Sequence, residues 1–209
     1  MLIILFFVVI HFWLQMKSYR FSAENVIKIG QKYSGKGIEQ AFQKVASELQ
    51  ERYRGHILPP KYREWVMLKN SGMTLSIAVL HASITEYIAL TGSALDTQGY
   101  LGRHWLNTTL IVLSGSVKYW EEGSIEAIEY HPGDSFTFYS GTTGCLAWEA
   151  NTWIIEYARG FLPLSLPVVV SDQLFTSFDV LGILKVFRAF GVAYYYELKS
   201  DIASFIGSI

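Results

Sequence analysis

One carboxylate lies in a segment that otherwise suits the interior of a β-sheet. The segment "NTWIIEYARG" runs from Asn151 to Gly160, and Glu156 is in its middle. Side chains of a strand alternate between two faces, so Ile154, Glu156 and Ala158 share one face. Both faces are mostly apolar, and a buried carboxylate is costly unless it is paired or hydrogen-bonded. Glu156 is therefore expected either to hold a proton through a raised pKa or to bind a cationic ligand.

A hydrogen-bond donor for this carboxylate is present in the segment "EYIALTG", in which Tyr87 could reach Glu156. The chain is also rich in aromatic residues, with 6 Trp, 13 Tyr and 13 Phe. A buried acid among aromatic rings suits a cationic amphiphile, because it offers an ion pair, cation–π contacts and apolar walls. The same acid could stabilise a carbocation or protonate a carbon–carbon double bond. The alternative is a structural glutamate that is bonded to a tyrosine or a backbone amide.

Short strands are expected to position this acid, because the middle of the chain has the pattern of β structure. Residues 73–79 alternate in polarity, and further strands follow up to residue 160, separated by turns of Gly, Pro, Asp and Ser. This spacing predicts a closed barrel or a sandwich. Two helices are predicted between residues 22 and 53, with a break at "SGKG". The fold class is therefore predicted to be α+β.

A small barrel with the turn "HPGD" is similar to a cupin, a fold that can hold a metal. Cupin metal sites use a His-x-His pair together with a carboxylate and a further histidine. None of the five histidines forms such a pair: they are His11, His56, His81, His104 and His131. We therefore expect no metal site and no cofactor. Cys145 is the single cysteine, so no internal disulfide is expected.

The composition favours contact with a membrane or a large ligand cavity. Hydrophobic residues make up 51% of the chain and charged residues 17%, and the net charge of −1 gives no sign of nucleic-acid binding. Residues 1–16 are apolar and are predicted to be a membrane anchor, although a full span needs about 20 residues. A cleaved signal or a buried helix is the alternative.

The end of the chain returns to helical periodicity. Phe178, Leu181 and Leu184 form an apolar stripe, and Lys185 and Arg188 lie at its edge. This pattern predicts two amphipathic helices that lie on a membrane, that pack on the barrel, or that do both. The predicted division is a membrane anchor (1–16), a helical segment (17–70), a cupin-like ligand-binding barrel (71–160) and a membrane-associated helical tail (161–209).

Several segments together resemble one known family. "HASITEYIALTGSALDTQGYLGRHW", "YHPGDSF" and "NTWIIEYARG" are similar to the family of the sigma-1 receptor and the fungal C-8 sterol isomerase. "FSAENVIKIGQKYSG", "GHILP" and "SDQLFTSFDV" are similar to the same family. The resemblance covers nearly the whole chain after the anchor. It is closer to the receptor branch, because "NTWIIEYARG" and "FLPLSL" follow that branch.

The resemblance implies an N-terminal transmembrane helix, a cupin-like β barrel and two C-terminal amphipathic helices that face the membrane. It also implies a homotrimer in the endoplasmic reticulum membrane, client membrane proteins, and an occluded pocket for hydrophobic amines, steroids or sphingoid lipids. In that pocket Glu156 would bind the amine and Tyr87 would hydrogen-bond to Glu156. The other implied ligand-binding residues are Trp148, Ile77, Val79, Ala89 and Phe190.

The chain departs from the family at four of the compared positions. The family's second acid falls on Leu110, a nearby acid falls on Asn107, Met73 replaces a pocket tryptophan, and Thr91 replaces a phenylalanine. Glu156 therefore lacks the carboxyl partner with which it would share a proton. Without this partner, both amine affinity and proton-transfer chemistry are expected to be weaker.

Three functions stay open from the sequence. The first is a receptor-like membrane protein that binds ligands without turning them over. The second is a C-8 sterol isomerase, in which Glu156 is the catalytic acid that moves a Δ8 double bond to Δ7, with help from a group such as Tyr87 or His81. The third is a structural membrane adaptor.

Overall fold

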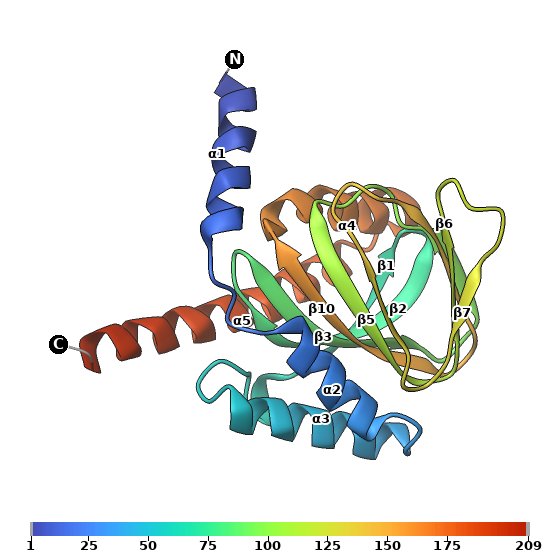
Figure 1. The fold of residues 1–209 in the computed structure, drawn as a ribbon, viewed down its shortest axis with the longest axis horizontal. Coiled ribbons are helices and arrows are strands. Elements are labelled where there is room, and N and C mark those ends of the chain that lie inside the picture. Colours follow the sequence, from blue (N-terminus) through green and yellow to red (C-terminus); the bar gives the residue numbers. More distant parts are fainter. Residues whose placement is uncertain (1, 208–209) are drawn as a thin grey trace.

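The computed structural model describes residues 2–207, which form an α+β fold of two β-sheets with helices against them (Figure 1). The α-helices are α1 (Leu2–Met16), α2 (Ala23–Tyr33), α3 (Ile38–Arg52), α4 (Leu166–Asp172) and α5 (Val180–Gly207). The strands are β1 (Trp65–Asn70), β2 (Met73–Ala82), β3 (Glu86–Ser93), β4 (Thr97–Tyr100), β5 (Leu106–Ser114), β6 (Val117–Glu121), β7 (Ile128–Tyr130), β8 (Ser135–Phe138), β9 (Gly144–Trp148) and β10 (Thr152–Gly160). Two 3-10 turns, η1 (Pro60–Tyr62) and η2 (Leu162–Ser165), and one π-helical turn, η3 (Gln173–Ser177), complete the described elements.

The strands pair antiparallel in two sheets, and their order brings segments that are distant in the chain side by side. The larger sheet has the order β1-β2-β3-β10-β5-β8, and the smaller has the order β4-β9-β6-β7. Strand β10 therefore lies between β3 and β5 in the interior of the larger sheet. Both of its edges are paired, and most of its side chains are buried on both faces, as the apolar sequence of this segment predicts.

Helices α2 and α3 cover the outer face of the larger sheet. A core cluster joins Val26 of α2 and Leu49 of α3 to strand residues such as Ile155. Helix α2 lies close to β5 at Gly30, where an added Cβ would be 2.6 Å from Cγ2 of Ile111. The missing side chain of Gly30 thus permits the close approach of helix and sheet.

Two different elements, the smaller sheet and helix α5, pack against the inner face of the larger sheet. The smaller sheet covers one part, through a cluster that includes Leu110 and Ile154 of the larger sheet and Trp148 of β9. Helix α5 covers the other part, where Val186 packs in a cluster with Ile77 and other residues of β1 and β2. The inner face is therefore enclosed partly by a sheet and partly by helices.

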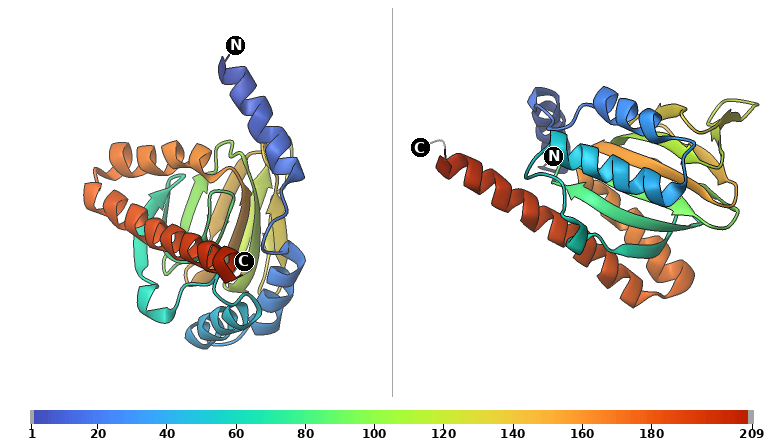
Figure 2. Two further views of the ribbon diagram at one scale, coloured as in Figure 1. Left: turned by 90° about the vertical axis from the view of Figure 1, so that its left-hand side faces the viewer. Right: turned by 90° about the horizontal axis from the view of Figure 1, so that it is seen from below.

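The tail contains the two predicted helices. The first, α4 with η3, ends at Phe178, whose positive φ of 52° turns the chain, and α5 follows. The Asp179 carboxylate accepts a hydrogen bond from the backbone N–H of Gly182 at 2.7 Å, which caps α5. The Asp172 carboxylate accepts a hydrogen bond from the backbone N–H of Gly72 at 2.9 Å, which fixes α4 to the β1–β2 turn. Figure 2 shows the C-terminal part of α5 extending beyond the sheets.

Two expectations about the first third of the chain differ from the structure. Helix α1 projects from the body of the protein (Figures 1 and 2). Across residues 2–207, no helix combines the length and the apolar character that crossing a membrane requires, so the transmembrane helix predicted for residues 1–16 has no support. Strand β1 lies inside the segment 17–70, so β structure begins before the predicted boundary at residue 71.

Candidate functional site

Glu156 occupies the inner face of β10, as the alternation of the segment predicts. Ile154 and Ala158 belong to clusters on the inner face, whereas Ile155 and Tyr157 pack toward α2 and α3. The side chain of Glu156 therefore points away from the helices α2 and α3. It points toward the space that the smaller sheet and helix α5 enclose on the inner face.

Two hydroxyl groups of β3 hold the carboxylate. Glu156 pairs with Ala89 in the register, and Tyr87 and Thr91 lie two residues to either side of Ala89. The Tyr87 hydroxyl donates a hydrogen bond to Oε1 at 2.6 Å, and the Thr91 hydroxyl donates one to Oε2 at 3.1 Å. Each oxygen thus accepts from a diagonal neighbour, and the small side chain of Ala89 leaves room between the donors. The predicted hydrogen bond between Tyr87 and Glu156 is present.

Burial raises the pKa of Glu156 above its ordinary value of 4.5, while the hydrogen bonds from Tyr87 and Thr91 act in the opposite direction. Burial also raises the pKa of Tyr87 well above 10, and the adjacent carboxylate adds to that rise. Although it lies deep in the fold, Glu156 keeps accessible surface, because it borders a cavity. A cation in this cavity would favour the ionised form of the acid.

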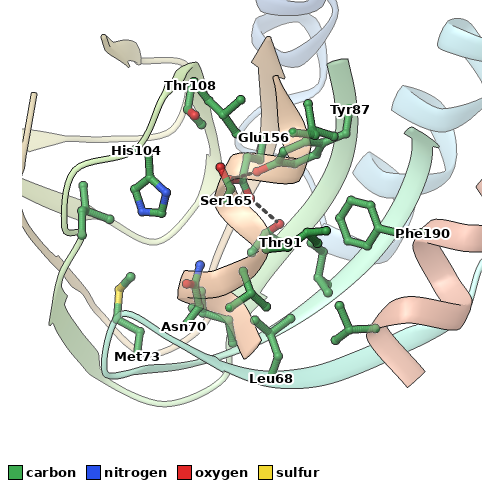
Figure 3. A pocket seen from close by; sticks show the side chains of 18 of the residues that line it. Leu68, Asn70, Met73, Tyr87, Thr91, His104, Thr108, Glu156, Ser165 and Phe190 are labelled. Atoms are coloured by element: carbon green, nitrogen blue, oxygen red, sulfur yellow. Dashed lines mark hydrogen bonds between the residues drawn. The ribbon is translucent and has the colours of Figure 1, made fainter. Parts of the chain in front are cut away.

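The cavity next to Glu156 has a volume of about 280 Å³ (Figure 3). Its walls come from both sheets, from the loop between β4 and β5, and from η2, α4 and α5. Among the described residues that line it, Glu156 is the one acid. The apolar part of the lining includes Leu68, Met73, Leu75, Leu101, Leu106, Leu110, Phe138, Leu146, Ile154, Val169, Val186 and Phe187. One acid in a predominantly apolar cavity is the composition expected of a ligand pocket.

The other predicted ligand-binding residues are divided between the cavity and the core. Trp148, Ile77 and Phe190 border the cavity. Val79 and Ala89 lie outside the lining, in the cluster that packs against α5. Both are buried on the inner face, but α5 covers this part of the sheet directly. The binding roles given to these residues stay predictions.

Besides Thr91 and Tyr194, four further polar lining residues are not among the predicted site residues: Asn70, His104, Thr108 and Ser165 (Figure 3). They belong to β1, the β4–β5 loop, β5 and η2, which are far apart in the chain. Burial lowers the pKa of His104 below 6.5, and a hydrogen bond to the Leu101 carbonyl opposes that shift. The four residues do not belong to one sequence motif, so the sequence does not indicate that they lie together in one cavity.

Leu110 is the direct cross-strand neighbour of Glu156 on β5, and it is buried. Directly opposed Cβ atoms in an antiparallel pair are about 4.5–5.5 Å apart, so an acid at this position could share a proton with Glu156. Leu110 supplies no carboxyl at the position where the resemblance implies the family's second acid. The departure at Thr91 has the opposite character, because its hydroxyl adds a donor to the same carboxylate.

His81, one of the groups considered as a proton-transfer helper, is not in the cavity lining. It is 1% exposed, and its Nδ1–H donates a hydrogen bond to the His56 carbonyl at 2.7 Å. Burial lowers the pKa of His81 to about 4, so its ring is neutral at neutral pH. Unlike His81, Tyr87 borders the cavity and contacts Glu156.

A second buried glutamate lies on the outer face of the same strands. Glu86 accepts a hydrogen bond from the backbone N–H of Arg20 at 2.7 Å and one from Phe21 at 3.4 Å. The Tyr157 hydroxyl lies 3.1 Å from the same carboxylate and 2.8 Å from the Phe21 carbonyl. Glu86 thus joins the segment before α2 to the sheet and is not among the described residues that line the cavity.

A third acidic group lies where α5 passes the body of the protein. His56, Glu197 and Asp201 place one potential metal-ligand atom each within 4.8 Å of one another. The Arg20 guanidinium is 3.0 Å from the Glu197 carboxylate and 2.6 Å from that of Asp201. Because this cation already compensates both acids, the cluster is better suited to fixing α5 than to holding a metal.

Comparisons with known proteins agree with the resemblance noted in the sequence. The model of the family described as "ERG2 and Sigma1 receptor like protein" matches residues 1–200. The sigma non-opioid intracellular receptor 1 of Danio rerio is 39% identical over 181 residues, which cover 87% of this chain and 82% of the receptor. An erg2 homolog of Dictyostelium discoideum is 29% identical over 147 residues, which cover 70% of this chain and 62% of that protein. An RmlC-like cupin from Shewanella frigidimarina matches 50% of this chain and 90% of its own, with a TM-score of 0.43 and 14% identity.

Proposed function

Because the chain belongs to the ERG2 and sigma-1 receptor-like family, we propose that it is a receptor-like protein that binds hydrophobic amines, steroids or sphingoid lipids beside Glu156. The observation that carries this proposal is a single acid in an apolar cavity, held by two hydroxyl groups. An ammonium group would form an ion pair with Glu156, and the lining would cover the apolar body of the ligand.

The geometry supports a site in which one acid accepts both charged and neutral ligands. Protonated Glu156 is neutral and can remain in the cavity beside a steroid. Ionised Glu156 attracts a cation, while Tyr87 and Thr91 continue to donate to its oxygens. The aromatic ring of Phe190, whose centroid is 5.7 Å from that of Tyr87, adds a wall on which an ammonium group can lie.

Calorimetric titration of the purified protein with n-decylamine, and with n-decanol as a neutral probe of the same length, tests the proposal. We expect Glu156→Gln to weaken amine binding by about 2 to 5 kcal/mol, because it removes one partner of a buried ion pair. Binding of the alcohol should change little, because the amide retains a hydrogen-bonding group. Equal affinity of wild type and variant for the amine would contradict the anchoring role.

Sterol isomerisation is the second candidate, and the erg2 homolog among the relatives favours it. Moving the double bond requires one proton to be added and another to be removed, and the described lining offers Glu156 as its one acid. Incubation with a Δ8 sterol, followed by mass spectrometry, distinguishes the two candidates. A Δ7 product from the wild type that is absent from Glu156→Gln would identify an isomerase. Amine binding without formation of the Δ7 sterol would support the receptor-like function.

The tail supplies a surface that suits a membrane. Exposed apolar side chains follow α4, η3 and the start of α5, with exposed fractions from 43% to 77%: they are Leu166, Phe175, Phe178, Val180, Leu181, Leu184 and Phe187. Leu166 and Phe187 also line the cavity. We infer that this surface rests on a membrane and that apolar ligands reach the cavity from it. Placement in the endoplasmic reticulum membrane, assembly as a homotrimer and client membrane proteins belong to the same proposal and are supported by the family alone.

Flotation with liposomes tests the membrane surface. A chain without residues 1–16 should still float with the liposomes, because the tail surface remains. The same chain with Phe178→Glu and Leu181→Glu should stay in the soluble fraction, because both side chains are more than two-thirds exposed and apolar. A truncated chain that stays soluble without those two changes would contradict the role of the tail.

A further inference from the structure

The charged side chains of the tail differ in their partners. The acids are Asp172, Asp179, Glu197 and Asp201, and the bases are Lys185, Arg188 and Lys199. Asp172 and Asp179 each accept a hydrogen bond from a backbone N–H group. Glu197 and Asp201 share the guanidinium of Arg20. The acids of the tail therefore already have partners inside the protein.

The bases of the tail have no comparable partners. Arg188 lies 3.9 Å from the Glu64 carboxylate, and its side chain is 72% exposed. An exposed ion pair of this kind contributes little free energy. Lys185 and Lys199 are also exposed, and neither takes part in an ion pair within residues 2–207. These cations therefore remain available to an external anion.

Lys185, Arg188 and Lys199 follow one flank of α5, which we call the basic flank. At 3.6 residues per turn, they lie within about 60° of one another around the helix axis. The neighbouring face carries aliphatic and aromatic side chains that are 49% to 69% exposed: they are Leu184, Tyr195, Leu198 and Ile202. Val186 and Ala189, on the opposite side of α5, are buried against the body. The helix therefore presents an exposed apolar face with cations along one edge.

We propose that the basic flank binds the headgroups of anionic lipids, so that the tail prefers an anionic membrane to a zwitterionic one. This inference rests on the membrane-bound tail of the proposed function and adds the charge of the lipid to it. Lysine and arginine side chains can reach the headgroups while their aliphatic stems cover apolar surface. A negatively charged bilayer attracts each of these cations, and the acids of the tail oppose that attraction little because their partners lie inside the protein.

The apolar face favours a bilayer over other anionic partners. A bilayer presents acyl chains directly beneath its headgroups, so it can cover the apolar face and neutralise the basic flank at the same time. A soluble anion or an acidic protein segment would contact the basic flank and would leave the apolar face exposed to water.

The test is flotation of the full chain with two kinds of vesicle. One consists of phosphatidylcholine, and the other of equal parts phosphatidylcholine and phosphatidylglycerol. The wild type should bind the anionic vesicles more tightly, and this preference should shrink at high salt because salt screens exposed charges. Each of Lys185→Gln, Arg188→Gln and Lys199→Gln should lower the preference by about three- to fivefold, and the triple variant by more. The triple variant should bind the phosphatidylcholine vesicles as the wild type does, which shows that the fold and the apolar face are intact.

Two further variants separate position from net charge. Lys185→Arg, Arg188→Lys and Lys199→Arg in one chain keep the charges and should keep the preference. Lys28→Gln, Lys36→Gln and Lys44→Gln in one chain remove as many exposed charges from the segment of α2 and α3, which lies on the outer face of the larger sheet. This control should also keep the preference.

Four results would overturn the inference. If the wild type binds both kinds of vesicle equally at low salt, or if the triple glutamine variant of the basic flank keeps the preference, the basic flank does not bind lipid headgroups, although the tail surface still stands. An equal loss of preference in the control on α2 and α3 would assign the effect to net charge. If soluble polyglutamate binds through the basic flank while the vesicles show no preference, the flank serves an acidic protein segment. If the wild type binds neither kind of vesicle, the membrane part of the proposed function fails together with the inference.

Discussion

Two glutamate–tyrosine pairs lie on opposite faces of the same two strands, and they serve different purposes. Glu86 of β3 and Tyr157 of β10 meet on the outer face, whereas Tyr87 of β3 and Glu156 of β10 meet on the inner face. Both pairs are diagonal in the register of the two strands. The functional groups are the same, so the difference between the pairs comes from their surroundings.

The partners of each carboxylate show what it is for. Glu86 is 3% exposed and accepts backbone N–H groups of Arg20 and Phe21, so it completes the main-chain bonding of another segment. Glu156 accepts two side-chain hydroxyls and borders a cavity. Hydroxyl groups can rotate, and a cavity can admit a cation, so Glu156 keeps the capacity to change its charge and its partner. A buried acid is therefore informative about ligands only when the main chain does not already use it.

The largest expected difference between the pairs is in folding stability. Glu86→Ala should lower the free energy of unfolding by roughly 3 kcal/mol, because two backbone N–H groups lose their acceptor. Glu156→Ala should lower it by less than about 1 kcal/mol, because it removes a buried acid whose pKa is raised by burial. Urea denaturation of both variants measures the two values. Equal losses would show that both acids are structural.

The next expected effect concerns pH, and it applies to the inner pair. Because the pKa of Glu156 is raised above 4.5, a fraction of the acid is protonated at pH values where an ordinary glutamate is ionised. The affinity for a quaternary alkylammonium should rise with pH through this raised pKa, by up to about tenfold per pH unit below it, and should then level off. Titrations in a pH series measure the profile. In Glu156→Gln it should be flat, and a profile that falls with rising pH in the wild type would contradict the account.

The smallest expected effect separates the two tyrosines. Tyr87→Phe removes a donor that favours ionised Glu156, so the pH profile of ammonium binding should move to higher pH. Tyr157→Phe should leave that profile in place and should lower the free energy of unfolding by about 1 kcal/mol, because it removes a buried hydrogen bond. The same titrations and denaturation curves measure both. A shift of the profile in Tyr157→Phe would remove the distinction between the two faces.

The sequence predicts the inner pair better than the outer one, for a physical reason. An acid in an apolar alternating segment is visible in the sequence, and Tyr87 lies at a strand position from which it reaches Glu156. Glu86 precedes Tyr87 directly, but its partners are backbone amides of residues 20 and 21, which no side-chain pattern reveals. The alternation of strands likewise predicts a barrel or a sandwich of short strands, whereas β1 lacks a clear signal because its exposed Trp65 and Met67 break the polar alternation.

The lining of the cavity likewise depends on contacts that the sequence pattern does not reveal. Ile77 and Val79 follow each other on one face of β2, and the sequence treats them alike. In the structure Ile77 borders the cavity and Val79 packs under α5, because the tail helix covers only part of the inner face. His104 enters the lining from a loop, whose path no periodicity predicts. The position of a helix far along the chain therefore decides which strand residues a ligand can contact.

Carbon-13 NMR of the glutamate side-chain carboxyl carbons is the most direct test of whether Glu156 anchors a cationic ligand. Glu156→Gln and Glu86→Gln assign the two resonances, and both are followed against pH with and without a saturating quaternary alkylammonium. We expect Glu156 to titrate above 4.5 in the empty protein and to move to the ionised position when the ammonium is added. The resonance of Glu86 should not respond to the ligand. A Glu156 resonance that titrates at or below 4.5, or that is unchanged by the ammonium, would contradict the claim that this acid anchors a cationic ligand.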